Sequence, residues 1–191
     1  MDIQKTAIEG VYIIKPDVFG DSRGYFYESY NKKRLAELLP DIPEMVQDNQ
    51  SKSSHGVLRG LHFQNPPYAQ AKLVRVVSGK VLDVAVDLRP GSKTFGKYVS
   101  VELTGENMLQ FFIPEGFAHG FSVLSEEAVF QYKCSNYYNK ASEGGIIWND
   151  PTIGVDWKLN PEDVMLSDKD KVHPTLVEWA KLNGIDFKNE K

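Results

Sequence analysis

The chain is built from short apolar runs separated by turn-forming residues. The clearest run is 80–88, where leucine or valine at every second position alternates with Asp83, Ala85 and Asp87. A period of two is typical of a half-buried β-strand. Comparable runs bounded by glycine, proline, serine or asparagine predict further strands at 11–14, 24–30, 57–64, 71–78, 97–103, 108–113, 119–124 and 128–137.

Only two segments have helical signals. Asn31 can cap a helix over 32–39, and Pro174 and Gly184 bracket a second helix over 175–182. The apolar stripe of the second helix consists of Leu176, Trp179 and Leu182. Many short strands with few helices predict an all-β sandwich or small barrel, in which the interior is wide enough for one small ligand.

Length and charge narrow the class of protein. A chain of 191 residues predicts a single domain over 1–191. A net charge of −4 disfavours a nucleic-acid partner, and an N-terminus without a basic region or long apolar run predicts neither a signal peptide nor a membrane span. The single cysteine, Cys134, excludes an intramolecular disulfide, fits a cytoplasmic location and is expected to be a buried structural residue.

Histidine is scarce, with four in the chain. His62 and His119 lie on predicted strands among apolar residues, where each is either a core histidine or a functional one. His55 and His173 lie in polar sequence and are interpreted as surface residues. Strict alternation would place Arg59 and His62 on opposite faces, so they share a pocket only if a glycine between them bends or bulges the strand.

A metal centre or other cofactor is not expected, because no histidine stands two positions from His62. His62 is instead a candidate general base, provided that a carboxylate orients it. The candidates are Asp83, Asp87 and the acidic residues of 166–170, and sequence alone leaves the choice open, although strand aspartates such as the first two are more often solvated or structural.

Other residue types suggest a proton donor and an anionic ligand. Tyr132 lies on the apolar face of its predicted strand, and a phenol with an unperturbed pKa of about 10 suits proton donation to a carbanion. Cations occur in or beside apolar strands at Arg23, Arg59, Lys72 and Arg75, where they need either acidic partners or an anionic ligand such as a phosphate. The segments 47–49 and 25–27 offer amides and aromatic rings for a nucleobase, and no P-loop or Rossmann glycine motif is present.

Taken together, these segments resemble the dTDP-4-dehydrorhamnose 3,5-epimerases, which are cupin-fold enzymes of dTDP-L-rhamnose synthesis. The resemblance runs from about residue 3 to 170 and includes Leu58-Arg-Gly-Leu-His-Phe-Gln64 and Leu166-Ser-Asp-Lys-Asp170. The other matching segments are 18–24, 26–30, 46–52, 72–75, 83–87, 113–121, 132–133, 136–138, 143–144 and 147–150. The loop at 65–69 differs from the family, which would affect only the rim of the site.

The resemblance implies a fold, an assembly and a set of roles. The fold would be a cupin-type jelly roll that works as a homodimer on a dTDP-4-keto-6-deoxy sugar, without metal. His62 would be the base oriented by Asp170, Tyr132 the acid on the opposite face of the sugar, and Lys72 the cation that stabilises the enolate. The substrate-binding residues would be Arg23, Phe26, Glu28, Gln47, Asn49, Arg59, His119, Tyr138, Glu143 and Lys169. Of these, Arg23 and Glu28 would reach the neighbouring subunit's site.

Three alternatives remain open at this point. The same scaffold could epimerise only one carbon of a related dTDP-4-keto sugar, a choice that product stereochemistry would decide. A non-catalytic sugar-nucleotide-binding barrel would not need His62 together with Asp170. A metal-dependent cupin oxygenase or isomerase would contain bound iron, manganese or zinc.

Overall fold

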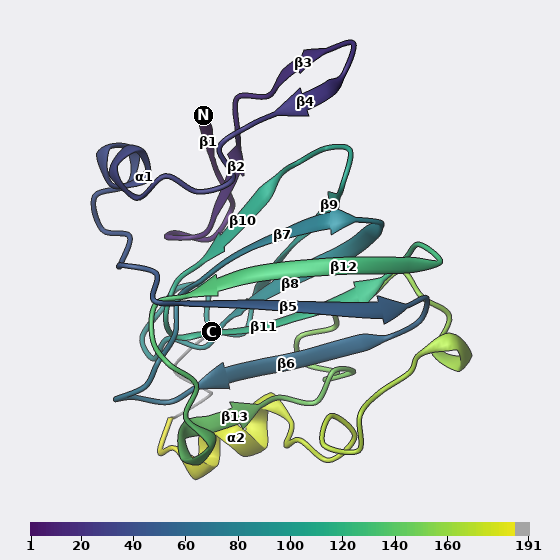
Figure 1. The fold of residues 1–191 in the computed structure, drawn as a ribbon. Coiled ribbons are helices and arrows are strands. Elements are labelled where there is room, and N and C mark those ends of the chain that lie inside the picture. Colours follow the sequence, from purple (N-terminus) through teal and green to yellow (C-terminus); the bar gives the residue numbers. More distant parts are fainter. Residues whose placement is uncertain (186–191) are drawn as a thin grey trace.

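Strands with alternating apolar residues build two antiparallel sheets whose apolar faces meet (Figure 1). The structure is a computed structural model, and it describes residues 1–185. The six-stranded sheet has the order β1 (Asp2–Lys5), β2 (Tyr12–Lys15), β10 (Gln110–Ile113), β7 (Lys72–Ser78), β12 (Glu127–Cys134) and β5 (Gln47–Ser54). The five-stranded sheet has the order β13 (Glu143–Gly145), β6 (Leu58–Gln64), β11 (Phe117–Val123), β8 (Lys80–Asp87) and β9 (Tyr98–Thr104). The predicted all-β class is confirmed.

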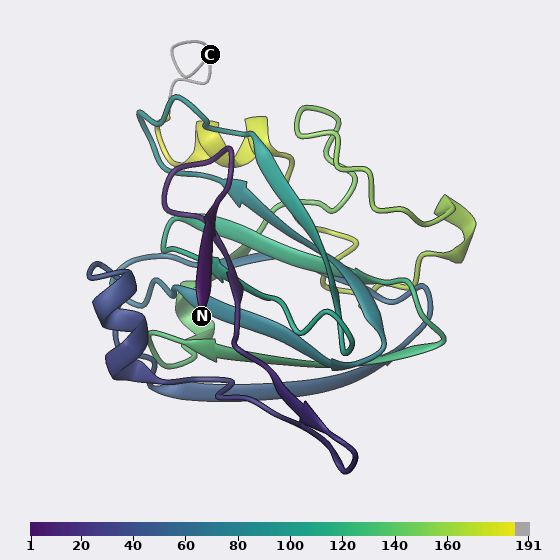
Figure 2. The ribbon, with the colours of Figure 1, turned by 90° about the horizontal axis from the view of Figure 1, so that it is seen from above.

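The remaining elements lie outside these two sheets. A separate hairpin of β3 (Phe19–Asp21) and β4 (Gly24–Phe26) projects away from the body (Figure 1). The helix α1 (Lys32–Leu38) and the helix α2 (Leu176–Leu182) lie on opposite sides of the sandwich (Figure 2). Short 3₁₀ turns occupy Lys140–Ser142 and Pro161–Asp163. In the part of the chain that the structure describes, neither helix has the length and apolar character needed to cross a membrane.

Three apolar clusters hold the layers together. The central cluster lies between the sheets, where Phe121 of β11 stacks on Phe130 of β12 with ring centroids 4.1 Å apart. A second cluster lies between the outer face of the five-stranded sheet and the C-terminal segment with Leu176. A third packs Leu35 of α1 against the other sheet. Because both faces of β8 are covered, the prediction that 80–88 is half-buried was wrong, and Asp83 is fully buried.

Both helices begin with a side-chain cap, of which the Asn31 cap was predicted and the Thr175 cap was not. The Asn31 side chain accepts a hydrogen bond from the backbone N–H of Arg34 at 3.0 Å, and Thr175 forms a capping box with Glu178. The stripe expected on α2 is only partly correct, since Leu176 is buried but Leu182 is 80% exposed.

Four strands were not predicted, and the longest is β5. Its inward side chains are Asn49, Ser51 and Ser53, which are as polar as the outward ones. Such a strand lacks the apolar alternation on which the prediction depends. Its inner face lines a polar cavity, which explains why it carries no core residue.

Gly60 bends β6 as the sequence analysis required. Its φ is +142°, and a Cβ at this position would lie 2.5 Å from Cα of Gly120 on β11. The β6–β11 register shifts between His119 and Phe121, directly opposite this glycine. Consequently Arg59 and His62 line the same cavity.

Asp87 organises the connection between β8 and β9. Its buried carboxylate accepts hydrogen bonds from the Arg89 guanidinium at 2.7 and 2.9 Å, and from the Ser92 and Thr94 hydroxyls at 2.6 Å. Burial alone would raise the pKa of Asp87, but these hydrogen bonds outweigh it and hold the pKa below its usual value. The side chain is therefore structural.

The variant Asp87→Asn should lower the free energy of unfolding at pH 7 by about 2 kcal/mol, the scale of hydrogen bonds to a charged group. A depressed folded-state pKa contributes stability above the unfolded pKa, about 3.9, and this contribution is lost as pH falls through the folded pKa. In urea unfolding, the variant should thus have a free energy of unfolding that is lower than that of wild type by a constant amount from pH 7 to about pH 4. The difference should shrink between about pH 4 and pH 3. The control Asp156→Asn, at an exposed pair with Lys158, should change stability little; a deficit at Asp87 that grew in acid would contradict this assignment.

Candidate active site

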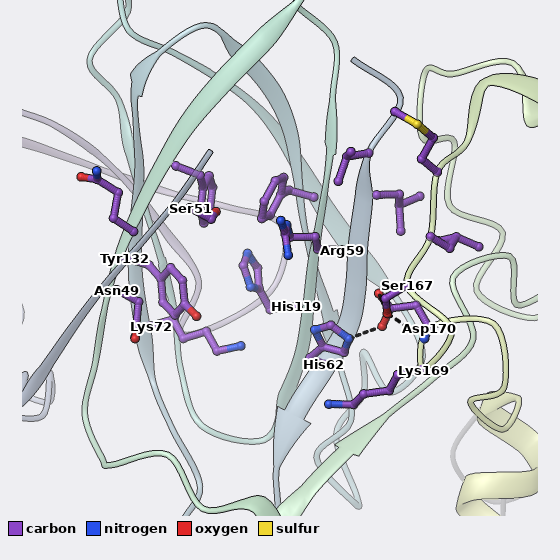
Figure 3. A pocket seen from close by; sticks show the side chains of 17 residues that line it. Asn49, Ser51, Arg59, His62, Lys72, His119, Tyr132, Ser167, Lys169 and Asp170 are labelled. Carbon is purple, nitrogen blue, oxygen red and sulfur yellow. Dashed lines mark hydrogen bonds and ion pairs between the residues drawn. The ribbon is translucent and has the colours of Figure 1, made fainter. Parts of the chain in front are cut away.

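A cavity of about 580 Å³ opens between the two sheets and is lined by side chains from both (Figure 3). Its volume lies in the range of small-molecule sites. The five-stranded sheet contributes Arg59, His62 and His119, and the six-stranded sheet contributes Lys72 and Tyr132. The segment 165–170 closes one side.

His62 and Asp170 form a directly bonded pair. Nε2 of His62 on β6 donates to Oδ1 of Asp170, which lies 108 residues later in the chain. The Ser167 hydroxyl donates to the other oxygen, Oδ2, at 2.9 Å. Burial would raise the pKa of Asp170, but the hydrogen bonds from His62 and Ser167 outweigh it and lower the pKa. The carboxylate is therefore charged and fixes both the tautomer and the direction of the His62 ring.

Tyr132 and Lys72 face His62 from the opposite sheet. In Figure 3 the Tyr132 hydroxyl and the Lys72 ammonium group point across the cavity toward His62. Burial raises the pKa of Tyr132, so the phenol stays protonated at neutral pH, and burial lowers the pKa of Lys72. The cavity thus has an imidazole bonded to a carboxylate on one wall and a protonated phenol beside a lysine on the other.

His119 and Asp83 form a second histidine–aspartate pair, which is buried. Nε2 of His119 lies 3.0 Å from both carboxylate oxygens of Asp83, and Cα of His119 is paired with that of His62 across β11 and β6. Burial raises the pKa of Asp83 and lowers that of His119. Asp83 therefore pairs with His119, and Asp170 is the carboxylate that His62 contacts.

An adjoining pocket of about 360 Å³ extends the site toward β13. The two pockets share Asn49, His62, Lys72 and Tyr132. The added pocket brings together Gln47, Tyr138 and Glu143, which are linked by hydrogen bonds: Tyr138 donates its hydroxyl to Glu143 at 3.1 Å and its backbone N–H to Gln47 at 3.1 Å. Lys169 forms an ion pair with Glu143. The residues predicted to bind substrate that meet here are Gln47, Asn49, Tyr138, Glu143 and Lys169.

Arg59 and Asn49 are held at the walls of the larger cavity. The Arg59 guanidinium donates through Nε to the Ser53 hydroxyl at 3.2 Å and is otherwise exposed. Asn49 donates to the sulfur of Cys134 at 3.6 Å. Cys134 is 1% exposed, as predicted, and burial raises the pKa of its thiol.

Three predicted site residues do not reach this cavity within the subunit. Arg23 lies on the projecting hairpin, pairs with Asp21 and has a side chain 87% exposed. Phe26 on the same hairpin is 68% exposed. Glu28 accepts a hydrogen bond from Asn31 at 3.1 Å, outside the cavity.

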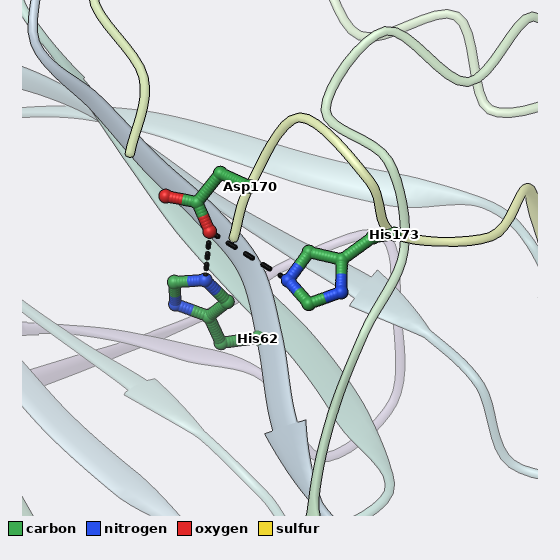
Figure 4. Close-up of side chains that lie close together, drawn as sticks. All are labelled: His62, Asp170 and His173. Carbon is green, nitrogen blue, oxygen red and sulfur yellow. Dashed lines mark hydrogen bonds and ion pairs between the residues drawn. The ribbon is translucent and has the colours of Figure 1, made fainter. Parts of the chain in front are cut away.

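The prediction for His173 was wrong. It is not a surface residue but a half-buried one whose ring meets the His62 ring edge-on, with centroids 5.7 Å apart (Figure 4). Ser167 was not singled out either, although a serine three residues before Asp170 is the spacing of a side-chain-to-backbone turn. No local signal marks His173, because its contacts with His62 and Gly145 come from β6 and β13, which are distant in the sequence.

The described geometry suits proton transfer at carbon. A C–H beside a carbonyl group loses its proton only if the resulting enolate is stabilised, which a preplaced cation such as Lys72 provides. Inversion at that carbon needs a base on one face and an acid on the other. His62 and Tyr132 lie on opposite walls of one cavity and meet that requirement.

Comparison with known proteins agrees with this chemistry. A sequence model described as dTDP-4-dehydrorhamnose 3,5-epimerase matches residues 5–178. A curated protein of that name from Shigella flexneri is 56% identical over 170 residues, covering 89% of this chain and 93% of the relative.

Solved structures extend the likeness to the fold. The dTDP-4-dehydrorhamnose 3,5-epimerase of Elizabethkingia anophelis matches with a TM-score of 0.90 and 56% identity over 93% of this chain and 97% of that one. The 3,5-epimerase of Legionella pneumophila, in complex with dTDP-4-keto-L-rhamnose, matches with a TM-score of 0.89 and 52% identity over 92% and 93%. These neighbours have the cupin-type jelly roll, which confirms the expected architecture. The chain belongs to the dTDP-4-dehydrorhamnose 3,5-epimerase family.

Proposed function

We propose that this chain converts dTDP-4-dehydro-6-deoxy-D-glucose to dTDP-4-dehydro-L-rhamnose by inverting carbons 3 and 5 of the sugar. The observation that carries this proposal is the arrangement of His62 with Asp170 on one wall of the cavity and Tyr132 with Lys72 on the other. Both carbons lie beside the 4-keto group, so one enolate-stabilising site can serve them in turn.

The first step is proton removal by His62. Its Nε2 is bonded to Asp170, which leaves Nδ1 as the nitrogen that accepts the proton from the sugar C–H. As the imidazole becomes charged, the Asp170 carboxylate stabilises it. Lys72 stabilises the negative charge that develops on the 4-keto oxygen.

The second step is proton delivery by Tyr132 to the opposite face. Its raised pKa keeps the hydroxyl protonated at neutral pH, and an enolate carbon is basic enough to take that proton. The His62 and Tyr132 roles are complementary because one group begins without the proton and the other begins with it.

The other residues of the cavity and of the adjoining pocket are suited to binding the nucleotide. Arg59 and Lys169 supply cations for the diphosphate, and the exposed Tyr138 ring can stack on the base. Gln47, Asn49 and Glu143 supply hydrogen-bonding groups in the adjoining pocket. His119, held by Asp83, lies beside Lys72 at the floor, where it supports the sugar end.

The functional unit that we propose is a homodimer. The β3–β4 hairpin extends away from its own subunit and carries Arg23 and the exposed ring of Phe26, with Glu28 just beyond it (Figure 1). A projecting hairpin that carries an arginine and exposed aromatic rings suits contact with the nucleotide in a second copy of the chain.

Proton exchange with solvent tests the function. In D2O, the wild-type protein incubated with dTDP-4-dehydro-6-deoxy-D-glucose should introduce deuterium at both C3 and C5 and form the L-rhamno product, as measured by mass spectrometry and proton NMR. His62→Ala should abolish incorporation at both positions, because the base is gone. Deuterium at a single carbon would instead assign a mono-epimerase, and folded protein without incorporation would overturn the proposal.

The role of the carboxylate is tested by comparing two aspartates of one loop. Asp170→Asn should lower kcat for exchange by about 10²-fold or more, since a positioned acid–base group contributes about 10²–10⁴-fold. Asp168→Asn, whose side chain is fully exposed and pairs with Lys171, should retain the wild-type rate. Equal rates in the two variants would remove Asp170 from the mechanism.

A further inference from the structure

His173 adds a third metal-ligating group to the His62–Asp170 pair. Its Nε2 lies 3.6 Å from Oδ1 of Asp170, the same oxygen that His62 contacts (Figure 4). Each of the three residues has one potential ligand atom, a ring nitrogen or a carboxylate oxygen, that lies within 4.8 Å of those of the other two. The proposed reaction assigns no task to His173, so its position beside the catalytic pair has no explanation there.

Nε2 of His173 is buried and makes no hydrogen bond with the described residues, although it lies 3.6 Å from the Asp170 carboxylate. Buried polar atoms are nearly always hydrogen-bonded, and one that is not loses free energy relative to its hydrated state. In the tautomer with its proton on Nδ1, this nitrogen offers a cation a lone pair close to a carboxylate and to a second imidazole.

Gly145 makes room for this ring. A Cβ at Gly145 on β13 would lie 2.5 Å from Nε2 and Cε1 of His173. Gly145 is also the register partner of His62 across β13 and β6. The imidazole of His173 is therefore confined between the β13 backbone and the Asp170 carboxylate. Because the side chain is already held in place, it would lose little conformational entropy on binding an ion.

We propose that His62, Asp170 and His173 form a binding site for a divalent transition-metal ion of the zinc class, and that the bound ion inhibits the epimerase. Two imidazoles and one carboxylate are a ligand set that zinc accepts, with a fourth position left for water. A tetrahedral ion with bonds of about 2.1 Å separates its ligand atoms by about 3.4 Å. The His173–Asp170 distance already fits, while His62 must move away from Asp170 as the ion replaces the proton that they share.

Inhibition follows from the chemistry of imidazole, and this part rests on the proposed function. An imidazole that binds a metal through Nε2 carries its proton on Nδ1. That nitrogen is the one proposed to accept the sugar proton, so metal-bound His62 has no free lone pair on the cavity side. The ion also removes Asp170 as counter-ion to the imidazolium.

Binding is measured first on the tag-free full-length chain without substrate, so that it does not depend on catalysis. Titration calorimetry with Zn²⁺ should give one ion per chain, and Co²⁺ should show the visible absorption of four-coordinate cobalt. His173→Gln should weaken binding at least about tenfold, the lower end of what loss even of an outer-shell partner costs. Gly145→Ala should weaken it similarly while leaving all three ligands in place, because the new methyl group displaces the His173 ring. His55→Gln, at an exposed histidine that does not line the cavity, is the matched control and should bind as wild type does.

Inhibition is measured second, with each variant normalised to its own rate without metal. The Zn²⁺ concentration for half inhibition of deuterium exchange should rise with the dissociation constant across wild type, His173→Gln and Gly145→Ala. Absence of one-to-one binding, or binding that His55→Gln weakens and His173→Gln does not, would overturn the site. Stoichiometric binding without inhibition would overturn the inhibitory role. Binding by a folded protein that is inactive even without metal would overturn the proposed function and the inhibitory role together, while supporting the site.

Discussion

The hydrogen bond between His62 and Asp170 is the interaction on which the rest of the site depends. It joins β6 to a loop 108 residues later and fixes the imidazole with one nitrogen toward the carboxylate and the other toward the cavity. Without it, the His62 ring would lose the contact that orients it, and Asp170 would lose its bond to β6, while Met165 would still hold its own segment to β6 through the backbone of Leu58. The Ser167 hydroxyl holds the second carboxylate oxygen, so the direction of the ring is set by two successive contacts.

The two sheets place the His62–Asp170 pair opposite Tyr132. Because His62 belongs to one sheet and Tyr132 to the other, the sandwich separates the proposed base from the proposed acid, and a sugar bound between them would present opposite faces to the two residues. The interior around them is apolar on the Phe121 and Phe130 side and polar on the β5 side. Burial in this interior shifts the pKa values of Lys72, Tyr132, Asp83 and His119 in the direction that disfavours charge. Electrostatic contacts with a developing enolate are correspondingly stronger than they would be in water.

Sequence reasoning recovered the parts of this arrangement that have local signals. Alternating apolar residues located most strands of both sheets, and Asn31 located the start of a helix. Gly60 marked the one place where a bend could bring Arg59 and His62 together. The choice of Asp170 over Asp83 and Asp87 came only from family resemblance. A contact between residues 108 positions apart produces no periodic pattern in the sequence that could predict it. The polar strand β5 and the placement of His173 were missed because the first has no apolar face and the second is defined by contacts with distant strands. The burial of β8 on both faces was missed because its outer cover is supplied by α2 and the C-terminal segment.

The most direct test of the two-wall account separates proton removal from inversion. In Tyr132→Phe, the base, its carboxylate and Lys72 remain, while the acid on the opposite wall is lost. In D2O this variant should still exchange the substrate C–H protons with retained configuration, and its formation of inverted product should fall by about 10²-fold or more. Inversion at the wild-type rate, or loss of exchange and inversion to the same extent, would contradict the assignment of base and acid to opposite sheets.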